Sequence, residues 1–339
     1  MSYVWNVAVV GWGVVCALTR WRWLGVIASY PAFVVGQLPL LAAYLVIVYT
    51  VLALVDHDFA SPSGAAAGGF AALVMVGIVV LIGWELRARA VIGHAMGMGG
   101  PHRRRPWLAI LTAPVPLGGR RALRVRDIPY GDDDRQRLDV YRPRGDGSGR
   151  PVLLHLHGGG FRSGAKTREA RPLIRQLTAA GWVCVSADYR LQPHATLRDQ
   201  VADASAAIAW VRELAGEYGG DPTALFVTGS SAGAYLAVRA IFGGASGVAG
   251  VIGRYGYYGG LTPTGDVPAM LILHGTHDLL VPAADARRFA DRVRAVSSRP
   301  VVYAELIGAG HPFDMFASVR ESAVAEAVEA FAAKTVRPN

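Results

Sequence analysis

The chain has 339 residues, of which 52% are hydrophobic and only 17% are charged. Water-soluble domains carry about 25% charged residues, so this composition indicates that part of the chain does not lie in water. The formal net charge of +9 raises nucleic-acid binding as an alternative, but no nucleic-acid-binding motif accompanies the basic residues. Many arginines follow the apolar N-terminal region instead, where a membrane surface accounts for them.

Three apolar runs predict membrane spans within residues 1–90. They cover residues 2–18, about 38–54 and 68–84, and each approaches the roughly 20 residues that cross a bilayer. Residues 23–37 are interrupted by proline, and we expect them to form an interfacial or tilted extension before the second span. Two alternatives stay open: the first run as a signal peptide, and all three runs as buried helices of a soluble protein.

The charges between these runs predict their orientation. Arg20 and Arg22 follow the first run, residues 56–58 between the second and third include no Lys or Arg, and Arg87 begins a basic cluster after the third. Basic residues mark the cytoplasmic side of a membrane. The sequence therefore predicts an external N-terminus, with everything after Trp84 in the cytoplasm.

Residues 91–121 are rich in Arg, Pro and Gly and are predicted to form a basic linker, before a catalytic domain over residues 122–335. Short apolar strands alternate with helices in this domain, which predicts a mostly parallel sheet covered on both faces. In such sheets the chemistry lies at the carboxyl ends of the strands. Strands are expected at 123–131, 137–143, 150–160, 182–190, 224–230, 248–256, 268–275 and 300–308, and helices at 167–181, 197–219, 232–244, 283–296 and 318–333.

A candidate nucleophile follows the strand at 224–230, in the sequence Gly229-Ser230-Ser231-Ala232-Gly233. A serine on a sharp turn between a strand and a helix is exposed at the edge of the sheet, and small neighbours let the two backbones pass closely. The helix that begins next also favours developing negative charge. Because Ser231 is the central residue of the motif, we expect it, rather than Ser230, to be the nucleophile.

A serine hydroxyl needs a base, and the base needs an orienting carboxylate. Asp278 lies in the loop after the strand at 268–275, and His311 lies in the loop after the strand at 300–308. The order Ser, Asp, His along the chain is the one expected of α/β-hydrolases. Taken alone, Asp278 fits a helix cap and His311 a surface loop, but the three residues together predict a catalytic triad.

The sequence His157-Gly158-Gly159-Gly160 follows the strand that begins at residue 150. Glycines there let backbone N–H groups point into a site without obstruction by a Cβ atom. Together with the N–H of Ala232, they are predicted to bind the oxyanion of a tetrahedral intermediate. The alternative is an ordinary flexible turn.

A metal site is a second alternative for the same region. His155 and His157 lie two residues apart on a strand, and His274, His277 and Asp278 add further ligand types. The triad and the glycine turn already account for these positions, so no metal and no cofactor is predicted.

Five motifs in order resemble the hormone-sensitive-lipase-like carboxylesterases of the α/β-hydrolase superfamily, and among these the membrane-anchored esterases of actinobacteria. The motifs are "HGGGF", "ADYRLQP", "GGDPTALFVTGSSAGAYLA", "HGTHDLLVP" and "GAGHPFD", and the resemblance covers about residues 122–333. It implies an α/β-hydrolase fold, with the oxyanion bound by Gly159, Gly160 and Ala232 and with His157 and Gly158 as the other residues of the glycine motif. The chain departs from the family at Ser230, Ala234 and Gln192, and only residues 256–267 fill the place of the family's helical cap.

The resemblance implies hydrolysis of acyl esters through an acyl-enzyme, and the short cap together with the apolar N-terminus predicts a membrane-dissolved substrate. Phe161, Tyr255, Tyr257 and Tyr258 are candidates for the substrate pocket, and Arg254 for contact with an anionic headgroup or a surface ion pair. Related small hydrolases make three other activities alternatives: amide hydrolysis, methyl-ester hydrolysis on prenylated cysteine, and acyl transfer. A membrane-anchored binding protein with an inactive hydrolase domain is the non-enzymatic alternative, and the sequence leaves the oligomeric state open.

Overall fold

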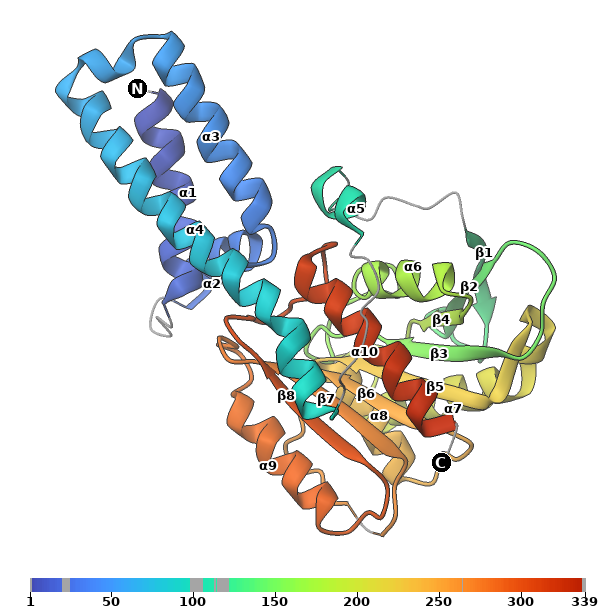
Figure 1. Cartoon of the computed structure of the whole chain (residues 1–339). Helices are drawn as coiled ribbons and strands as arrows, with labels where there is room; N and C mark the ends of the chain where they lie inside the picture. Colours follow the sequence, from blue (N-terminus) through green and yellow to red (C-terminus); the bar gives the residue numbers. More distant parts are fainter. Residues whose placement is uncertain are drawn as a thin grey trace.

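The computed structural model describes residues 2–19, 25–97, 106–112, 114, 122–263 and 265–336. Figure 1 shows an α/β domain from which a bundle of N-terminal helices projects. Arg20, Arg22 and most of the predicted linker at 91–121 lie outside the described residues.

An eight-stranded sheet forms the centre of the α/β domain, in the order β1-β2-β4-β3-β5-β6-β7-β8. The β1–β2 and β2–β4 pairs are antiparallel and all the others are parallel. The strands are β1 (Ala122–Pro129), β2 (Arg137–Pro143), β3 (Arg150–Leu156), β4 (Val183–Ala187), β5 (Gly220–Ser230), β6 (Gly250–Arg254), β7 (Ala269–Gly275) and β8 (Val301–Leu306). This confirms the predicted mostly parallel sheet, in which β3 to β8 are apolar enough to be covered on both faces.

Helices cover both faces of the sheet, each over its own hydrophobic cluster. On one face lie α7 (Leu197–Leu214), α8 (Ala232–Phe242) and α9 (Ala283–Arg294), and on the other α6 (Arg171–Ala179) and α10 (Val319–Val336). The remaining elements of this domain are the short helices α5 (Trp107–Thr112) and η3 (Ala215–Tyr218). The described residues between β6 and β7 form neither helix nor strand, so the carboxyl ends of these strands carry no helical cap of their own.

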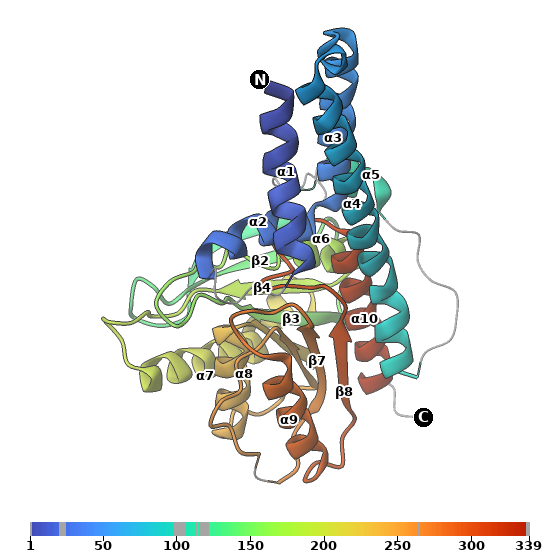
Figure 2. The ribbon, with the colours of Figure 1, turned by 90° about the vertical axis from the view of Figure 1, so that its left-hand side faces the viewer.

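The N-terminal helices are α1 (Ser2–Leu18), α2 (Gly25–Gln37), α3 (Pro39–Val55) and α4 (Pro62–Ala95), with η2 (Asp58–Ala60) between the last two. Figures 1 and 2 show α1, α3 and the first part of α4 as a bundle that points away from the α/β domain, with α2 at its base. We call the bundle of α1, α3 and residues 62–83 the stalk. By length and apolar composition α4 is able to cross a membrane, and the pair Tyr30–Gln37 and Pro39–Val55, bent by 91°, would be a second span if counted as one.

The second half of α4 belongs to the α/β domain. Ala88, Ile92 and Met96 are buried in the same hydrophobic cluster as α6 and α10. Arg89 pairs with Glu326 of α10, and Glu85 faces the buried Arg320 at 3.8 Å. One continuous 34-residue helix therefore joins the stalk to the catalytic core, beyond the predicted span at 68–84.

Substitutions in the two halves of α4 are expected to change the free energy of unfolding by different amounts. Ile92→Ala removes a side chain that is 2% exposed in the α/β core and should lower the free energy of unfolding by about 2–5 kcal/mol. Leu73→Ala is the matched control, because Leu73 lies on the same helix and is 70% exposed. It should change the free energy of unfolding by less than about 0.5 kcal/mol. Denaturant unfolding of the full chain in detergent measures both, and equal losses would show that α4 does not belong to the catalytic core.

Candidate active site

Ser231 occupies the turn between β5 and α8, with a strained backbone conformation of φ 53° and ψ −116°. The turn is sharp because the strand and the helix cross closely. A Cβ atom on Gly229 would lie 2.3 Å from the carbonyl carbon of Gly233, and one on Gly233 would lie 2.1 Å from the carbonyl oxygen of Leu156. Only glycine fits at both positions, so the spacing of the motif follows from the packing.

Asp278 and His311 lie in the loops after β7 and β8, and they are hydrogen bonded through His311 Nδ1 and Asp278 Oδ2 at 2.8 Å. The other carboxylate oxygen of Asp278 accepts the backbone N–H groups of Leu280 and Val281 at 2.9 and 2.8 Å. The carboxylate is therefore held at both oxygens, and Nε2 is the ring nitrogen of His311 that stays available to a serine. Among the described residues no hydrogen bond joins Ser231 to His311, a common state of catalytic pairs before substrate binds.

A second histidine contacts the same carboxylate, and the sequence analysis assigned it no part in the triad. His274 Nε2 lies 3.1 Å from Asp278 Oδ2 and 2.9 Å from the carbonyl oxygen of Val281, so it carries a proton and donates to both. Burial by itself would raise the pKa of Asp278, but the hydrogen bonds from His274 and His311 outweigh it and lower the pKa to about 2. Asp278 is therefore ionised throughout the neutral range, as an orienting carboxylate must be.

The glycine turn lies directly over the nucleophile, since a Cβ atom on Gly158 would come within 3.1 Å of the Ser231 Cβ. The N–H of Gly158 donates to Glu169 Oε2 at 2.6 Å. By contrast, the backbone N–H groups of Gly159, Gly160 and Ala232 have no acceptor among the described residues. These three donors are free for a substrate oxygen, whereas Gly158 is occupied.

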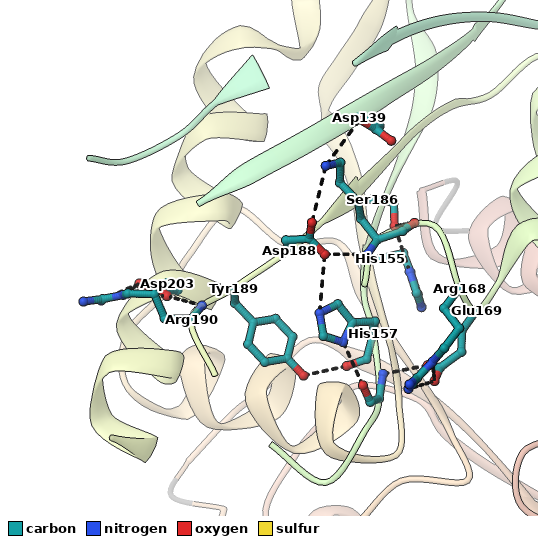
Figure 3. Close-up of polar contacts among 12 residues, drawn as sticks. Asp139, His155, His157, Arg168, Glu169, Ser186, Asp188, Tyr189, Arg190 and Asp203 are labelled. Atoms are coloured by element: carbon teal, nitrogen blue, oxygen red, sulfur yellow. Dashed lines mark hydrogen bonds and ion pairs between the residues drawn. The ribbon is translucent and has the colours of Figure 1, made fainter. Parts of the chain in front are cut away.

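His157 holds the turn in place from one side, as Figure 3 shows. Its Nδ1 donates to the carbonyl oxygen of Gly158 at 2.7 Å, its Nε2 lies 3.6 Å from Asp188, and its ring stacks on Tyr189 at 4.2 Å. Burial lowers the pKa of His157 to about 4, although the bond to Gly158 opposes this, so the ring is neutral at pH 7. His157 is thus a support for the oxyanion turn rather than a base.

Glu169 holds the turn from the other side and is a functional residue that the sequence analysis missed. Its carboxylate is 5% exposed, accepts from Gly158, and pairs with Arg168 at 2.6 Å. Burial raises its pKa, and the nearby charge of Asp314 adds to this. No motif around residue 169 marks this role, because the contact depends on how the loop after β3 folds back.

Beneath the nucleophile lies a cluster of fully buried polar side chains. Arg254 Nη1 contacts Asp314 Oδ2 at 2.9 Å, and the hydroxyl groups of Ser230 and Tyr255 donate to the same carboxylate at 3.0 and 2.6 Å. Glu321 lies 3.7 Å from Arg254. The predicted headgroup contact or surface ion pair of Arg254 is therefore wrong, since its side chain is 0% exposed and serves as the internal counter-ion of the catalytic loops.

The four predicted pocket residues separate into two pairs. Phe161 and Tyr257 both contact the ring of Tyr235, at 5.6 and 5.8 Å, and form an accessible aromatic row beside the elbow. Tyr235, from the first turn of α8, was not foreseen. Tyr255 instead lies buried with its ring against that of His311 at 4.7 Å, and Tyr258 stacks on Phe289 in the core at 4.4 Å. Tyr258 therefore belongs to the core, because the chain turns inward after β6.

The histidines that were considered as metal ligands contact protein groups instead. Nδ1 of His155 bonds to the Ser186 hydroxyl at 3.1 Å, His157 and His274 act as described above, and His277 contacts Thr276. No group of three or more His, Cys, Asp or Glu side chains within the described ranges is placed to hold a metal ion.

A mostly parallel sheet that brings a strained serine, a histidine–carboxylate pair and free backbone donors to one edge is the arrangement of the α/β-hydrolase class. The BD-FAE family matches residues 138–248. The chain is 32% identical to the probable carboxylic ester hydrolase LipM of Mycobacterium tuberculosis, over 93% of this chain and 86% of that protein. It is also 32% identical to the esterase LipQ of the same organism, over 72% of this chain and 70% of LipQ.

Among solved structures, the chain is similar to butyrate-bound esterase 2 of Thermogutta terrifontis. The TM-score is 0.52 and the identity 25%, over 62% of this chain and 92% of that one. The chain belongs to the family of α/β-hydrolase esterases that includes LipM and LipQ, and it is a carboxylic ester hydrolase.

The buried, neutral His157 is expected to make the stability depend on pH. The pKa of His157 is lower in the folded protein, at about 4, than the usual 6.5, so its contribution to stability is present above pH 6.5 and is lost as the pH falls toward 4. The difference in unfolding free energy between wild type and His157→Gln should therefore shrink on acidification, by up to about 1.4 kcal/mol per pH unit.

Thermal unfolding of both proteins from pH 7 to pH 4 measures this difference. Tyr189→Phe is the matched control, because it loses the bond from the tyrosine hydroxyl to the His157 carbonyl without removing a group that titrates in this range. The difference in stability between wild type and Tyr189→Phe should stay constant with pH. If the difference for His157→Gln stays equally constant, His157 is not a buried neutral histidine.

Proposed function

We propose that the chain is a membrane-anchored serine esterase that cleaves acyl esters of lipid-like molecules at the membrane surface. One observation carries the proposal: the residues of the catalytic centre lie beside the base of an apolar stalk. Figures 1 and 2 show α2 and the base of the stalk next to the end of the sheet where β7 and β8 finish.

The outer surface of the stalk supports the membrane anchor. Its three helical segments contain no charged residue. Water-soluble monomers rarely expose apolar patches beyond a few hundred Å², whereas this bundle is apolar outside as well as inside. Large side chains that face outward include Trp5, Val9, Tyr44, Ile47, Leu54, Leu73, Val76 and Val79.

The length of the stalk and the charges that flank its two ends fit a bilayer. A helix of 17 residues such as α3 is about 25 Å long, and residues 62–83 extend about 33 Å, close to the roughly 30 Å of a hydrocarbon core. Asp56 and Asp58 lie between α3 and α4 at the far end, and Arg87 and Arg89 follow the stalk at the near end. Because basic residues favour the cytoplasmic side, we propose that the catalytic domain is cytoplasmic.

The proposed reaction uses the groups described above. His311 takes the proton of the Ser231 hydroxyl as its oxygen attacks the carbonyl carbon of the ester, and Asp278 stabilises the protonated ring. The N–H groups of Gly159, Gly160 and Ala232 bind the oxyanion. His311 then protonates the leaving alcohol, and water cleaves the acyl-enzyme in the same way to release the acid.

The surroundings of the site support an apolar substrate. The row of Phe161, Tyr235 and Tyr257 offers an aromatic wall beside the nucleophile. On the side of the stalk, Leu280 and Tyr30 are 66% and 70% exposed. The similar Thermogutta terrifontis esterase 2 binds butyrate, which supports acceptance of at least a short acyl group.

Lysine substitutions on the stalk test the membrane anchor. Leu73→Lys with Val79→Lys places two charges on exposed stalk positions, at about 3 kcal/mol each in a bilayer, and should shift the protein out of the carbonate-resistant membrane fraction. Val125→Lys with Val296→Lys is the matched control, on exposed valines of the α/β domain, and should stay in the membrane. A double stalk variant that remains in the membrane fraction would contradict the anchor.

A substrate series tests the reaction. The full chain in nanodiscs should turn over esters of increasing acyl length, with kcat/KM rising for esters that partition into the bilayer, and Ser231→Ala should lose at least about 10⁴ of kcat together with fluorophosphonate labelling. Matched amides and methyl esters belong to the same series. Cleavage confined to short water-soluble esters would rule out the lipid-like substrate, and an unlabelled wild type would rule out the esterase.

A further inference from the structure

The loop that carries the catalytic histidine receives support from the N-terminal helices. Residues 309–318, between β8 and α10, form no helix or strand, so the backbone groups of this loop have no regular hydrogen-bond ladder. Within the α/β domain, Asp278 holds His311 and Arg254 holds Asp314. A third attachment comes from Gln37, at the end of α2.

Gln37 spans the loop with both ends of its side-chain amide. Its Nε2 donates to the carbonyl oxygen of Pro312 at 3.0 Å, and its Oε1 accepts from the backbone N–H of Met315 at 3.2 Å. The side chain is 3% exposed although it comes from an otherwise apolar helix. Because Pro312 directly follows His311, the first of these bonds acts one residue away from the catalytic ring.

The bend between α2 and α3 places Gln37 against the loop that carries His311. Pro39 begins α3, and the two helices meet at 91° across Leu38. The inward face of α2 then packs on the loop: the ring of Phe33 lies 5.6 Å from that of Phe316, and the carbonyl oxygen of Gly36 accepts from Arg320 at 3.4 Å. The hydrogen bonds of Gln37 are therefore part of a larger contact surface between α2 and the α/β domain.

A cavity of about 40 Å³ beside the catalytic histidine has walls from both parts of the molecule. Cys16, Phe33 and Gln37 line it from the N-terminal helices, and His277, Leu280 and His311 from the catalytic loops. The N-terminal helices thus form one side of the space next to His311, where the α/β domain has no helical cap.

We propose that Gln37 is a positioning residue for His311, so that the N-terminal helices complete the catalytic centre in addition to anchoring it. This inference rests on the proposed esterase function. Without the amide, the Pro312 carbonyl and the Met315 N–H lose their partners, and the loop that carries His311 is free to shift. A displacement of about 1 Å at a catalytic group lowers the rate about 100-fold. Loss of the Gln37 amide should therefore lower kcat.

Gln37→Met tests the proposal, because it keeps the length and volume of the side chain and removes both hydrogen bonds. With the full chain in detergent and p-nitrophenyl butyrate as substrate, kcat should fall about 10- to 100-fold while KM changes by less than about twofold. Gln37→Glu keeps an acceptor for Met315, but its ionised carboxylate sets a second oxygen against the Pro312 carbonyl oxygen, so its kcat should also fall.

The matched control is Thr50→Ala, which removes a half-buried hydroxyl that contacts Tyr3 and the Val46 carbonyl within the stalk. Its Tm should fall as much as that of Gln37→Met, with kcat unchanged. Wild-type kcat in Gln37→Met would overturn the proposal, and if that variant does not fold, wild-type kcat in Gln37→Glu would do so. Failure of the esterase assignment gives a different result, because then wild type itself shows no turnover that Ser231→Ala abolishes.

Discussion

The buried ion pair between Arg254 and Asp314 is the interaction on which the catalytic centre depends. The backbone carbonyl of Arg254 accepts from Ser231 N–H at 3.0 Å, and its guanidinium holds Asp314, three residues beyond His311. One residue at the end of β6 thus sets the position of the nucleophile and of the loop that carries the base. Two charges taken out of water need full compensation, and the hydroxyls of Ser230 and Tyr255 supply part of it.

Buried polar contacts also hold the other parts of the catalytic centre. Asp278 is held by two histidines and two backbone N–H groups, and the glycine turn by His157 and Glu169. The loops that carry Asp278 and His311 form no helix or strand, and buried side chains such as His274 and Arg254 supply part of their hydrogen bonds and ion pairs. The precision of the site therefore comes from buried polar contacts around it more than from the loops themselves.

The N-terminal helices are coupled to this arrangement at two levels. The second half of α4 completes the hydrophobic cluster on one face of the sheet, and α2 contacts the histidine loop. A division of the chain at residue 90 would cut through α4 and expose core side chains such as Ile92. The two parts therefore share the helix α4, and α2 connects the base of the stalk to the loop that carries His311.

The sequence by itself determined the alternation of strands and helices, the mostly parallel sheet, and the order in which Ser231, Asp278 and His311 follow their strands. These features depend on local patterns, namely apolar periodicity and small residues at a close backbone crossing. Only the tertiary structure decided which side chains support them. Glu169 and Gln37 hold groups that are 11 and 275 residues away along the chain. Arg254 and Tyr258 are buried where a surface or a pocket was expected. The physical reason is that burial and hydrogen-bond partnership arise from packing between distant segments, which no local pattern records.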